Sequence, residues 1–407
     1  MRSRKESHLW YGGSYTYLVE KLNWGGYCVV DRKGSVVYTE DDSNHAENAI
    51  QYAIDNLPSE GGIIQFTTGV FKIQDTVYFN ECIRFIGQSI RATKLELVGD
   101  CNMFEWRGGR GENEFFCEWH SLWMYGNRDT RNKGWAIDCP SVEGFNLVDS
   151  RIVDCYIDNF YDGGVFINNA WGWVIDRCAI EHHRGYALKV QAGGGLWLSN
   201  SKYSANRDSS VVAGTYLQCD RPLISNCQFE SNGARGLVLG NVGGGVIGNC
   251  YFKGNGEDLG SMRESLVLYN SENVLIENCL FDGYNGYIHQ QTTTYGIRVQ
   301  STCSNIFITD NRFYNHVNGA ILDEANSIIR HNIGYATENS GTATIANGNS
   351  SVTVNHGLAE APSVVKLTGT HSEVKDCWVT DVTSTQFTIH ASANVTADRE
   401  VYWEAKV

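Results

Sequence analysis

The sequence has little proline and no long apolar run. Only 4 of its 407 residues are proline. Proline cannot donate a ladder hydrogen bond, so its scarcity suits a chain rich in β-sheet. No apolar run approaches the ~18 residues that a membrane-spanning helix needs, so we expect no membrane insertion. The opening residues Met1–Glu6 are not followed by an apolar segment, so no secretory signal peptide is predicted.

Basic residues are also scarce. Lysine and arginine total 32 against 46 aspartate and glutamate residues, and the formal net charge is -14. Nucleic acids are bound through basic patches, and no basic cluster lies beyond the N-terminus, so no nucleic-acid partner is expected. An anionic substrate is expected only where a local groove is basic. With 42% hydrophobic and 12% aromatic residues, the chain is too apolar to be disordered.

The 13 cysteines contain no C-x-x-C pair, and five of them belong to an internal repeat. Each copy reads apolar, two mostly polar residues, Cys, any residue, apolar. The copies are residues 152–157, 175–180, 224–229, 247–252 and 276–281, and degenerate copies place Ser201, Asn311 and Asn332 at the Cys position. Repeats of this length indicate one structural unit that stacks on its neighbours.

Each repeat also carries a glycine followed by a second alternating run, as in Gly164–Ile167 and Gly236–Leu239. Apolar positions at every second residue exclude a helical repeat and predict a β-solenoid. Successive coils of a solenoid lie about 4.8 Å apart, so equivalent residues form ladders. The cysteines are therefore predicted to be an internal ladder of free thiols, with disulfides or a metal site as the alternatives. We expect no metal and no cofactor, and polar stacking where Ser201 or an asparagine enters the ladder.

The segment ahead of the repeats predicts one amphipathic helix at residues 46–57. Asp41 and Asp42 precede this helix, and their carboxylates are expected to cap its N-terminus. Strands are predicted at Gly61–Phe66, Gly69–Ile73 and Ile83–Gly87. This order resembles the opening of pectate-lyase-like right-handed parallel β-helix proteins. The resemblance implies an all-β solenoid over residues 41–335 whose helix covers the open edges of the first coil. The sequence lacks the calcium-binding aspartates and arginine base of pectate lyases, so the resemblance does not imply that activity.

Two further segments flank the predicted solenoid. Residues 1–40 contain Trp10, Tyr11, Trp24 and other aromatic residues, and are expected to pack on a partner or on the first coil. Residues 339–407 predict a small antiparallel β-sandwich. Its six expected strands span residues 342–346, 351–356, 363–369, 377–384, 386–392 and 400–407. The sandwich resembles C-terminal modules of viral tail and surface proteins, and this resemblance implies trimerisation or glycan contact.

The candidate catalytic residues follow from the ladder. Three residues after each Cys position lies an outward row, which reads Asp158, Glu181, Ser204, Glu230, Lys253, Asp282 and Tyr314. Carboxylates on adjacent coils would be ~5 Å apart and those two coils apart ~10 Å, close to the separations of retaining and inverting glycoside hydrolysis. The predicted catalytic residues are Asp158, Glu181, His182, His183 and Glu230. The histidines would serve as proton acceptors beside a sugar carboxylate if the reaction were a lyase reaction.

Aromatic and basic residues give the candidate binding site. Six tryptophans cluster near Asp158 and Glu181, and sugar rings stack on such faces: Trp119, Trp123, Trp135, Trp171, Trp173 and Trp197. Strand alternation would send Trp171 and Trp173 to the same face. Together with Arg184 and Arg207, these two tryptophans are the predicted substrate-binding residues.

Two functions remain open on the sequence alone. The first is a tailspike-type protein of the virion surface, assembled in the host cytoplasm. It would recognise a cell-surface polysaccharide, form a homotrimer, and attach to other virion proteins through residues 1–40. The second is an extracellular carbohydrate-active enzyme, a polysaccharide lyase or glycoside hydrolase. Binding and cleavage tests on a glycan panel distinguish them.

Overall fold

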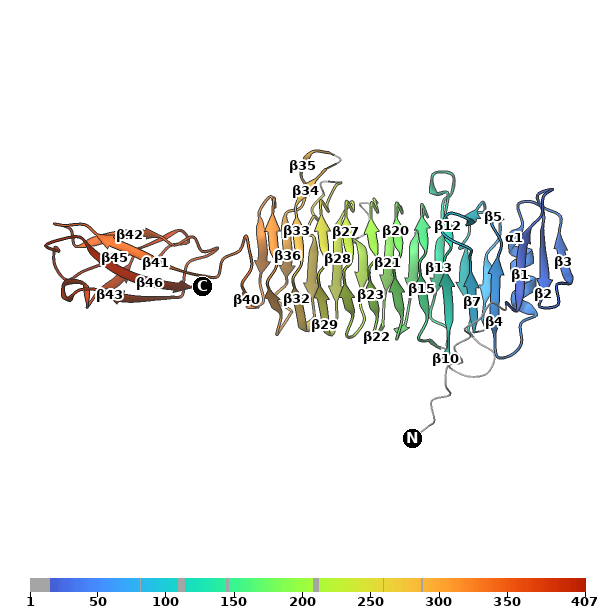
Figure 1. The fold of residues 1–407 in the computed structure, drawn as a ribbon, viewed down its shortest axis with the longest axis horizontal. Coiled ribbons are helices and arrows are strands. Elements are labelled where there is room, and N and C mark those ends of the chain that lie inside the picture. Colours follow the sequence, from blue (N-terminus) through green and yellow to red (C-terminus); the bar gives the residue numbers. More distant parts are fainter. Residues whose placement is uncertain are drawn as a thin grey trace, which may run out of the picture.

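Three long sheets wrap the chain into a solenoid (Figure 1). The computed structural model describes residues 15–80, 82–108, 114–143, 146–207, 212–258, 260–286 and 288–407. Within the described solenoid, each strand pairs in parallel with the equivalent strand of the next coil. Asp158, for example, lies opposite Glu181 on the neighbouring strand. A parallel β-helix was predicted from the repeats, and the structure confirms it.

The first sheet, called sheet 1, carries one strand per coil: β4 (Gly62–Phe66), β7 (Ile83–Ile86), β11 (Cys117–His120), β15 (Arg151–Val153), β19 (Val174–Asp176), β23 (Trp197–Ser199), β26 (Leu223–Ser225), β29 (Gly243–Gly248), β32 (Glu272–Glu277), β37 (Phe307–Thr309) and β40 (Ile328–Arg330). Sheet 2 contains β5 (Gly69–Ile73), β8 (Thr93–Leu97), β12 (Trp123–Tyr125), β16 (Tyr156–Asp158), β20 (Ala179–Glu181), β24 (Lys202–Ser204), β27 (Gln228–Glu230), β30 (Tyr251–Lys253), β33 (Leu280–Asp282) and β38 (Arg312–Tyr314).

Sheet 3 contains β6 (Val77–Phe79), β9 (Phe104–Trp106), β13 (Trp135–Cys139), β17 (Gly163–Ile167), β21 (Tyr186–Val190), β25 (Ala213–Leu217), β28 (Arg235–Gly240), β31 (Leu266–Tyr269), β36 (Tyr295–Val299) and β39 (Gly319–Asp323). Short pairs lie outside the three sheets: β10 (Glu114–Phe115) with β14 (Asn146–Leu147), β18 (Ala170–Trp171) with β22 (Gly193–Gly194), and β34 (Tyr284–Asn285) with β35 (Gln290–Gln291). The β34–β35 hairpin projects from the solenoid (Figure 1).

The cysteine ladder lies at the corner between sheets 1 and 2. Cys155, Cys178, Cys227, Cys250 and Cys279 are buried free thiols, as predicted. Ser201 continues the ladder by accepting a hydrogen bond from the backbone N of Cys178 at 3.0 Å. The polar stacking expected at the asparagines is also present, because Asn311 Nδ2 donates to Asn332 Oδ1 at 3.1 Å.

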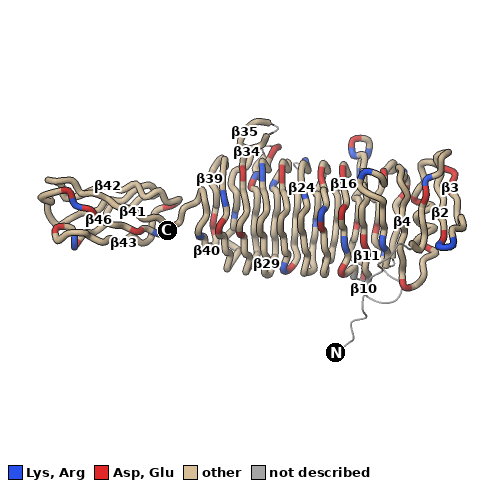
Figure 2. The backbone as a smooth tube through the Cα atoms, viewed as in Figure 1, with Lys and Arg blue, Asp and Glu red and all other residues tan. Residues whose placement is uncertain are grey.

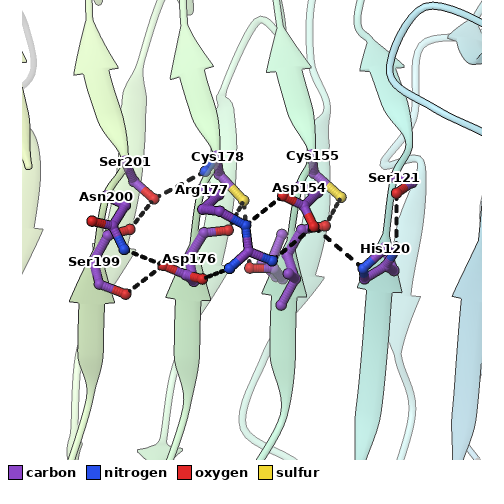
Figure 3. A network of polar contacts seen from close by, with 12 residues as sticks. His120, Ser121, Asp154, Cys155, Asp176, Arg177, Cys178, Ser199, Asn200 and Ser201 are labelled. Atoms are coloured by element: carbon purple, nitrogen blue, oxygen red, sulfur yellow. Dashed lines mark hydrogen bonds and ion pairs between the residues drawn. The ribbon is translucent and has the colours of Figure 1, made fainter. Parts of the chain in front are cut away.

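The residue before each ladder position turns the corner. Asp154, Arg177 and Asn200 all have φ near +50° (52°, 51° and 50°), a region that asparagine and aspartate tolerate better than most residues. Figure 3 shows these three side chains beside Cys155, Cys178 and Ser201 on successive coils. The Arg177 guanidinium donates to both carboxylate oxygens of Asp154, at 2.7 and 2.8 Å, so neighbouring coils are tied at the corner.

Two further ladders fill the interior on the side of sheet 2. Five aromatic rings stack with centroids 4.6–5.2 Å apart: Tyr203, Phe229, Phe252, Phe281 and Phe313. At the next corner Asn206, Asn232 and Asn255 form a buried amide ladder. Asn206 Nδ2 donates to Asn232 Oδ1 at 2.8 Å, and Asn232 Nδ2 donates to Asn255 Oδ1 at 2.9 Å. These bonds satisfy polar groups that would otherwise destabilise the interior.

One end of the solenoid is covered by α1 (Ala46–Asp55), two residues shorter than predicted, and its buried face packs into the main core. The expected capping by Asp41 and Asp42 is wrong. The N-cap residue is His45, with no side-chain capping bond, and Asp42 Oδ1 accepts from the backbone N of Asn44 at 2.8 Å, one turn before the helix. The aspartate therefore stabilises the preceding turn instead of the helix terminus.

Three antiparallel strands extend sheet 1 beyond the first coil: β1 (Tyr17–Lys21), β2 (Tyr27–Asp31) and β3 (Val36–Glu40). β1 pairs in parallel with β4, and buried Val19, Tyr27 and Val29 join the solenoid core. The expectation for Trp10 and Tyr11 lies outside the described residues. No helix in the described ranges is both long and apolar enough to cross a membrane.

The C-terminal residues form two three-stranded antiparallel sheets. One contains β41 (Glu338–Ile345), β46 (Arg399–Lys406) and β43 (Val364–Gly369), and the other contains β42 (Ser351–Asn355), β45 (Gln386–His390) and β44 (Trp378–Thr380). Ile345, Val401 and Trp403 from the first sheet share one core with Phe387 and Ile389 from the second. This is the antiparallel arrangement that the alternating segments predicted. The unit lies at the opposite end of the molecule from α1 (Figure 1).

Candidate functional site

The predicted outward row lies along sheet 2, one residue per coil. Asp158 pairs in register with Glu181, Glu181 with Ser204, and Ser204 with Glu230. We call these four residues the acid row. Neighbouring strands of a sheet lie about 4.8 Å apart, which is near the ~5–5.5 Å between the two carboxyl groups of retaining glycosidases. Glu181 and Glu230 are two strands apart, with Ser204 between them.

His182 connects the first two carboxylates of the row. Its Nδ1 lies 3.1 Å from Asp158 Oδ1 and 4.0 Å from Glu181 Oε1. Its φ of +59° turns the chain out of β20 and places the ring beside the row. Arg128, from the 3-10 turn η1 (Arg128–Thr130), donates to the His182 carbonyl. The structure thus brings together three of the predicted catalytic residues, Asp158, Glu181 and His182.

Glu181 is held as an anion by its neighbours. Lys202 Nζ lies 3.2 Å from Glu181 Oε2, and Ser204 Oγ donates to the same oxygen at 2.7 Å. Burial by itself would raise the pKa of Glu181, but the Ser204 hydrogen bond, Lys202 and His182 outweigh burial, so the pKa is lowered from its ordinary value. An anionic carboxylate is suited to act as nucleophile or general base.

Three aromatic residues of β12 and β16 lie beside the acid row: Trp123, Tyr125 and Tyr156. Trp123 and Tyr156 have ring centroids 5.7 Å apart, and Lys94 Nζ lies 3.9 Å from the Tyr125 ring centre. Burial raises the pKa of Tyr156, and the neighbouring Asp158 and Glu181 charges add to the effect, so its hydroxyl stays protonated as a hydrogen-bond donor. Sequence reasoning missed Tyr156 and Lys202, although each stands two residues before a row position and therefore on the same face.

Glu230 lies further along the row and has its own partners. Lys253 Nζ is 3.6 Å from Glu230 Oε1, and Gln228 Nε2 donates to Glu230 Oε2 at 2.8 Å. Acidic and basic residues both lie along this side of the solenoid, near β16 and β24 (Figure 2). The row is therefore a mixed, hydrogen-bonded surface and not a purely acidic one.

His183 lies inside the solenoid, in contrast to its predicted catalytic position. The side chain is fully buried, and its Nδ1 accepts a hydrogen bond from the backbone N of Phe160 at 3.1 Å. The backbone N of His183 in turn donates to Asn206 Oδ1 at 3.2 Å. His183 thus begins the interior amide ladder, and nothing of its ring faces solvent.

The two predicted binding tryptophans lie on different faces, so the same-face prediction is wrong. Trp171 is 49% exposed, whereas Trp173 is fully buried and donates from Nε1 to the Leu147 carbonyl at 2.9 Å. Gly172 between them has φ +68°, and this turn breaks the strand alternation on which the prediction depended. Trp171 lies in β18, on the connection from sheet 3 to sheet 1, away from the acid row.

The predicted arginines lie at the edge of sheet 2 that follows the acid row. Arg184 is stacked on Tyr161, with Cζ 4.6 Å from the ring centre, and Arg207 Nη2 lies 3.1 Å from Glu257 Oε1. The backbone N of Arg207 donates to the His183 carbonyl and that of Arg184 to the Phe160 carbonyl, so the two arginines occupy equivalent places on successive coils. Both side chains are exposed.

Among the described residues, one group of side chains could hold a metal ion, where the sequence predicted none. His45, Glu47 and Asp75 place ligand atoms within 4.8 Å of one another beside the start of α1. His45 Nδ1 and Glu47 Oε1 are 2.5 Å apart, and Glu47 Oε2 accepts from the backbone N of Gln74 at 3.0 Å. These contacts indicate that His45 and Glu47 stabilise the start of α1.

Residues 163–333 match the family model described as a right handed beta helix region. The solenoid is a right-handed parallel β-helix. This is the right-handed parallel β-helix fold that the sequence resemblance implied. No curated protein matches the chain.

Solved structures of viral proteins are among those that share this β-helix fold. The ORF18 protein of Geobacillus virus E2 aligns with a TM-score of 0.61 and 13% identity, over 91% of this chain and 84% of that one. The enzymatically active domain of tailspike protein 2 from bacteriophage CBA120 aligns with a TM-score of 0.50 and 11% identity, over 86% of this chain and 64% of that one. At these identities the likeness concerns the fold.

Proposed function

We propose that the protein is a tailspike-type surface protein of a virion that recognises a cell-surface polysaccharide through the outer face of sheet 2. The supporting observation is the arrangement of Trp123, Tyr125 and Tyr156 directly beside the acid row. Aromatic faces stack on sugar rings while carboxylates and a lysine hydrogen-bond their hydroxyl groups. The fold shared with a tailspike domain agrees with this role.

A Trp123→Ala variant tests the recognition. Loss of this ring, half-buried against Lys94 and Tyr156, is expected to weaken polysaccharide binding about tenfold, since an aromatic stacking contact contributes ~1 kcal/mol beyond its buried area. Binding is measured by calorimetry on whichever member of a panel of capsular and cell-wall polysaccharides the wild type binds. The matched control is Trp378→Ala, an exposed tryptophan of the C-terminal sheets. Equal losses in both variants would contradict a site on sheet 2.

A second candidate function is cleavage of that polysaccharide. It is favoured by the adjacent positions of Asp158 and Glu181, with His182 beside both. In this function the lowered pKa of Glu181 supplies an anion, and the raised pKa of Tyr156 keeps a neutral hydrogen-bond donor next to it. Binding and cleavage are compatible on one surface, so the enzyme would be a glycoside hydrolase or lyase acting on the glycan that it recognises.

We also propose that the protein is a homotrimer, attached to other virion proteins through its N-terminal segment. An apolar row runs along the outer face of sheet 1, where a soluble monomer would normally carry polar side chains. Its members pair in register on successive coils: Val174, Trp197, Leu223, Val246, Leu275, Phe307 and Ile328. Trp197 and Leu223 are 54% and 43% exposed in the single chain.

Lysines in the apolar row are expected to dissociate the trimer. The double variant Leu223→Lys, Phe307→Lys places two charges at the proposed interface, where burial of an unpaired charge is strongly unfavourable. Sedimentation should give three times the monomer mass for the wild type and the monomer mass for the variant. Ile90→Lys, at an exposed position of a loop between β7 and β8, is the control and should remain trimeric. A wild-type monomer would refute the homotrimer.

A further inference from the structure

A groove lies on the outer face of sheet 3, away from the acid row of sheet 2. We call it the tyrosine groove. Its cavity volume is about 290 Å³, and its lining comes from the strands and strand ends of four successive coils: Tyr186, Lys189, Gln191, Val212, Tyr216, Gln218, Arg235, Val238 and Tyr269. None of these described lining residues is an aspartate or glutamate, in a chain whose net charge is -14.

The floor of the groove is apolar. Ala213, Val238 and Val267 form a small cluster on the outside of sheet 3 that is separate from the solenoid core. Tyr216 and Tyr269 pack against this cluster. A dry apolar floor beneath aromatic rings is the surface on which the hydrophobic face of a sugar ring stacks.

Tyrosine hydroxyls converge above this floor. The hydroxyls of Tyr216 and Tyr269 hydrogen-bond to each other, and Gln218 Nε2 donates to the Tyr269 hydroxyl at 3.3 Å. Burial raises the pKa of Tyr216, with Tyr269 adding to the effect, and burial likewise raises the pKa of Tyr186. The phenols of Tyr216 and Tyr186 therefore remain neutral and available to sugar hydroxyl groups.

Two cations flank the hydroxyls. Lys189 Nζ lies 5.3 Å from the ring centre of Tyr186, and in the described part of the chain no carboxylate forms an ion pair with it. Arg235 uses Nε for Glu264, at 2.8 Å, which fixes the direction of its guanidinium at the groove wall. The Glu264 carboxylate is buried and is shared with Arg298 at 3.5 Å, so Arg235 is not its only cationic partner.

We infer that the tyrosine groove is a second saccharide-binding site, selective for a sugar unit that carries an anionic group. The apolar floor and the tyrosines would hold the ring, and Lys189 with Arg235 would bind the anion, since charge-assisted bonds are stronger than neutral ones. This inference goes beyond the recognition proposed for sheet 2, because the two surfaces share no residue. It also identifies the local basic patch that an acidic protein needs to bind an acidic glycan.

The experiment uses the full-length protein and three tetrasaccharide probes in calorimetry: a carboxylated uronic-acid tetramer, the same tetramer with its carboxylates methyl-esterified, and a sulfated neutral tetramer. The uronic-acid tetramer is expected to bind at least about tenfold more tightly than its methyl ester, since a charged hydrogen bond contributes ~1.5–3 kcal/mol. The sulfated tetramer distinguishes a site that selects any anion from one that selects a planar carboxylate.

The variant Lys189→Glu should weaken binding of the uronic-acid tetramer about tenfold or more, and Tyr216→Phe should weaken it less. Lys375→Glu is the matched control, because it changes the net charge equally at an exposed C-terminal position. Glu272→Gln, at an exposed position of sheet 1, should leave this binding unchanged, because it lies on a different sheet from both the tyrosine groove and the acid row. Equal affinity for the methyl ester, wild-type affinity in Lys189→Glu, or no binding of any anionic probe would each overturn the inference.

Discussion

Glutamine in place of Glu181 is expected to lower the rate of polysaccharide cleavage by about 10²–10⁴-fold, the usual contribution of a general acid–base or nucleophilic group. The substitution keeps the shape and the hydrogen bond to Ser204 but removes the charge that Lys202 and Ser204 stabilise. Binding should change little, because the aromatic residues beside the row are untouched. The measurement is release of reducing ends or unsaturated products from the glycan that the wild type binds.

A second substitution distinguishes the two possible carboxylate pairs. If Asp158 and Glu181 act as a pair on adjacent strands, Glu230→Gln should cleave at nearly the wild-type rate. If Glu181 acts with Glu230 across the Ser204 strand, both glutamine variants should be inactive. The control is Glu272→Gln at an exposed position of sheet 1. Full activity in Glu181→Gln would exclude Glu181 as a catalytic residue. A wild type that binds the polysaccharide without cleaving it would exclude the enzymatic function and leave recognition as the function.

The repeats were enough to predict both the fold and the register of the acid row. Once Cys155 and Cys178 are aligned, every residue at a fixed offset from them falls on one ladder, and this places Asp158 opposite Glu181 as the structure has it. The alternation of the C-terminal segments similarly predicted the two antiparallel sheets. In both cases side chains alternate between the two faces of a sheet, and this alternation fixes how neighbouring strands align, so few other arrangements are possible.

The predictions for His183 and Trp173 failed where the alternation of inward and outward side chains stops. His182 and Gly172 have positive φ, so the residues that follow them, His183 and Trp173, turn inward although a simple count places them outside. Asp154 and Asn200 show the same conformation at regular positions, so asparagine and aspartate next to the ladder give a usable signal for these corners. The tyrosine groove gave no such signal, because its lining residues come from four coils and share no repeated sequence motif.

Acid conditions test the inward position of His183. Burial lowers the pKa of this histidine well below its usual value, and the charges of Arg128 and His182 lower it further. The folded protein therefore keeps His183 neutral, whereas the unfolded chain binds a proton below pH ~6.5. The free energy of unfolding should be largest above pH 7, and this residue should remove about 2 kcal/mol of it between pH 7 and pH 5.

The variant His183→Asn should abolish that loss. Asn206 and Asn232 occupy the same ladder, and each accepts a backbone N–H from the preceding coil, as His183 Nδ1 does from Phe160. Asparagine can make this bond and also donate to Asn206, whereas His183 Nε2 has no partner among the described residues. The variant should therefore be at least as stable as the wild type at pH 7 and ~2 kcal/mol more stable at pH 5.

Urea unfolding at several pH values, followed by tryptophan fluorescence, measures both quantities. Part of the acid sensitivity should survive in the variant, because burial lowers the pKa of His316 to about 4. His331→Asn is the control: this side chain is 61% exposed, so its replacement should leave the pH profile of the wild type unchanged. An unchanged profile in His183→Asn would mean that the ring is not buried as a neutral group.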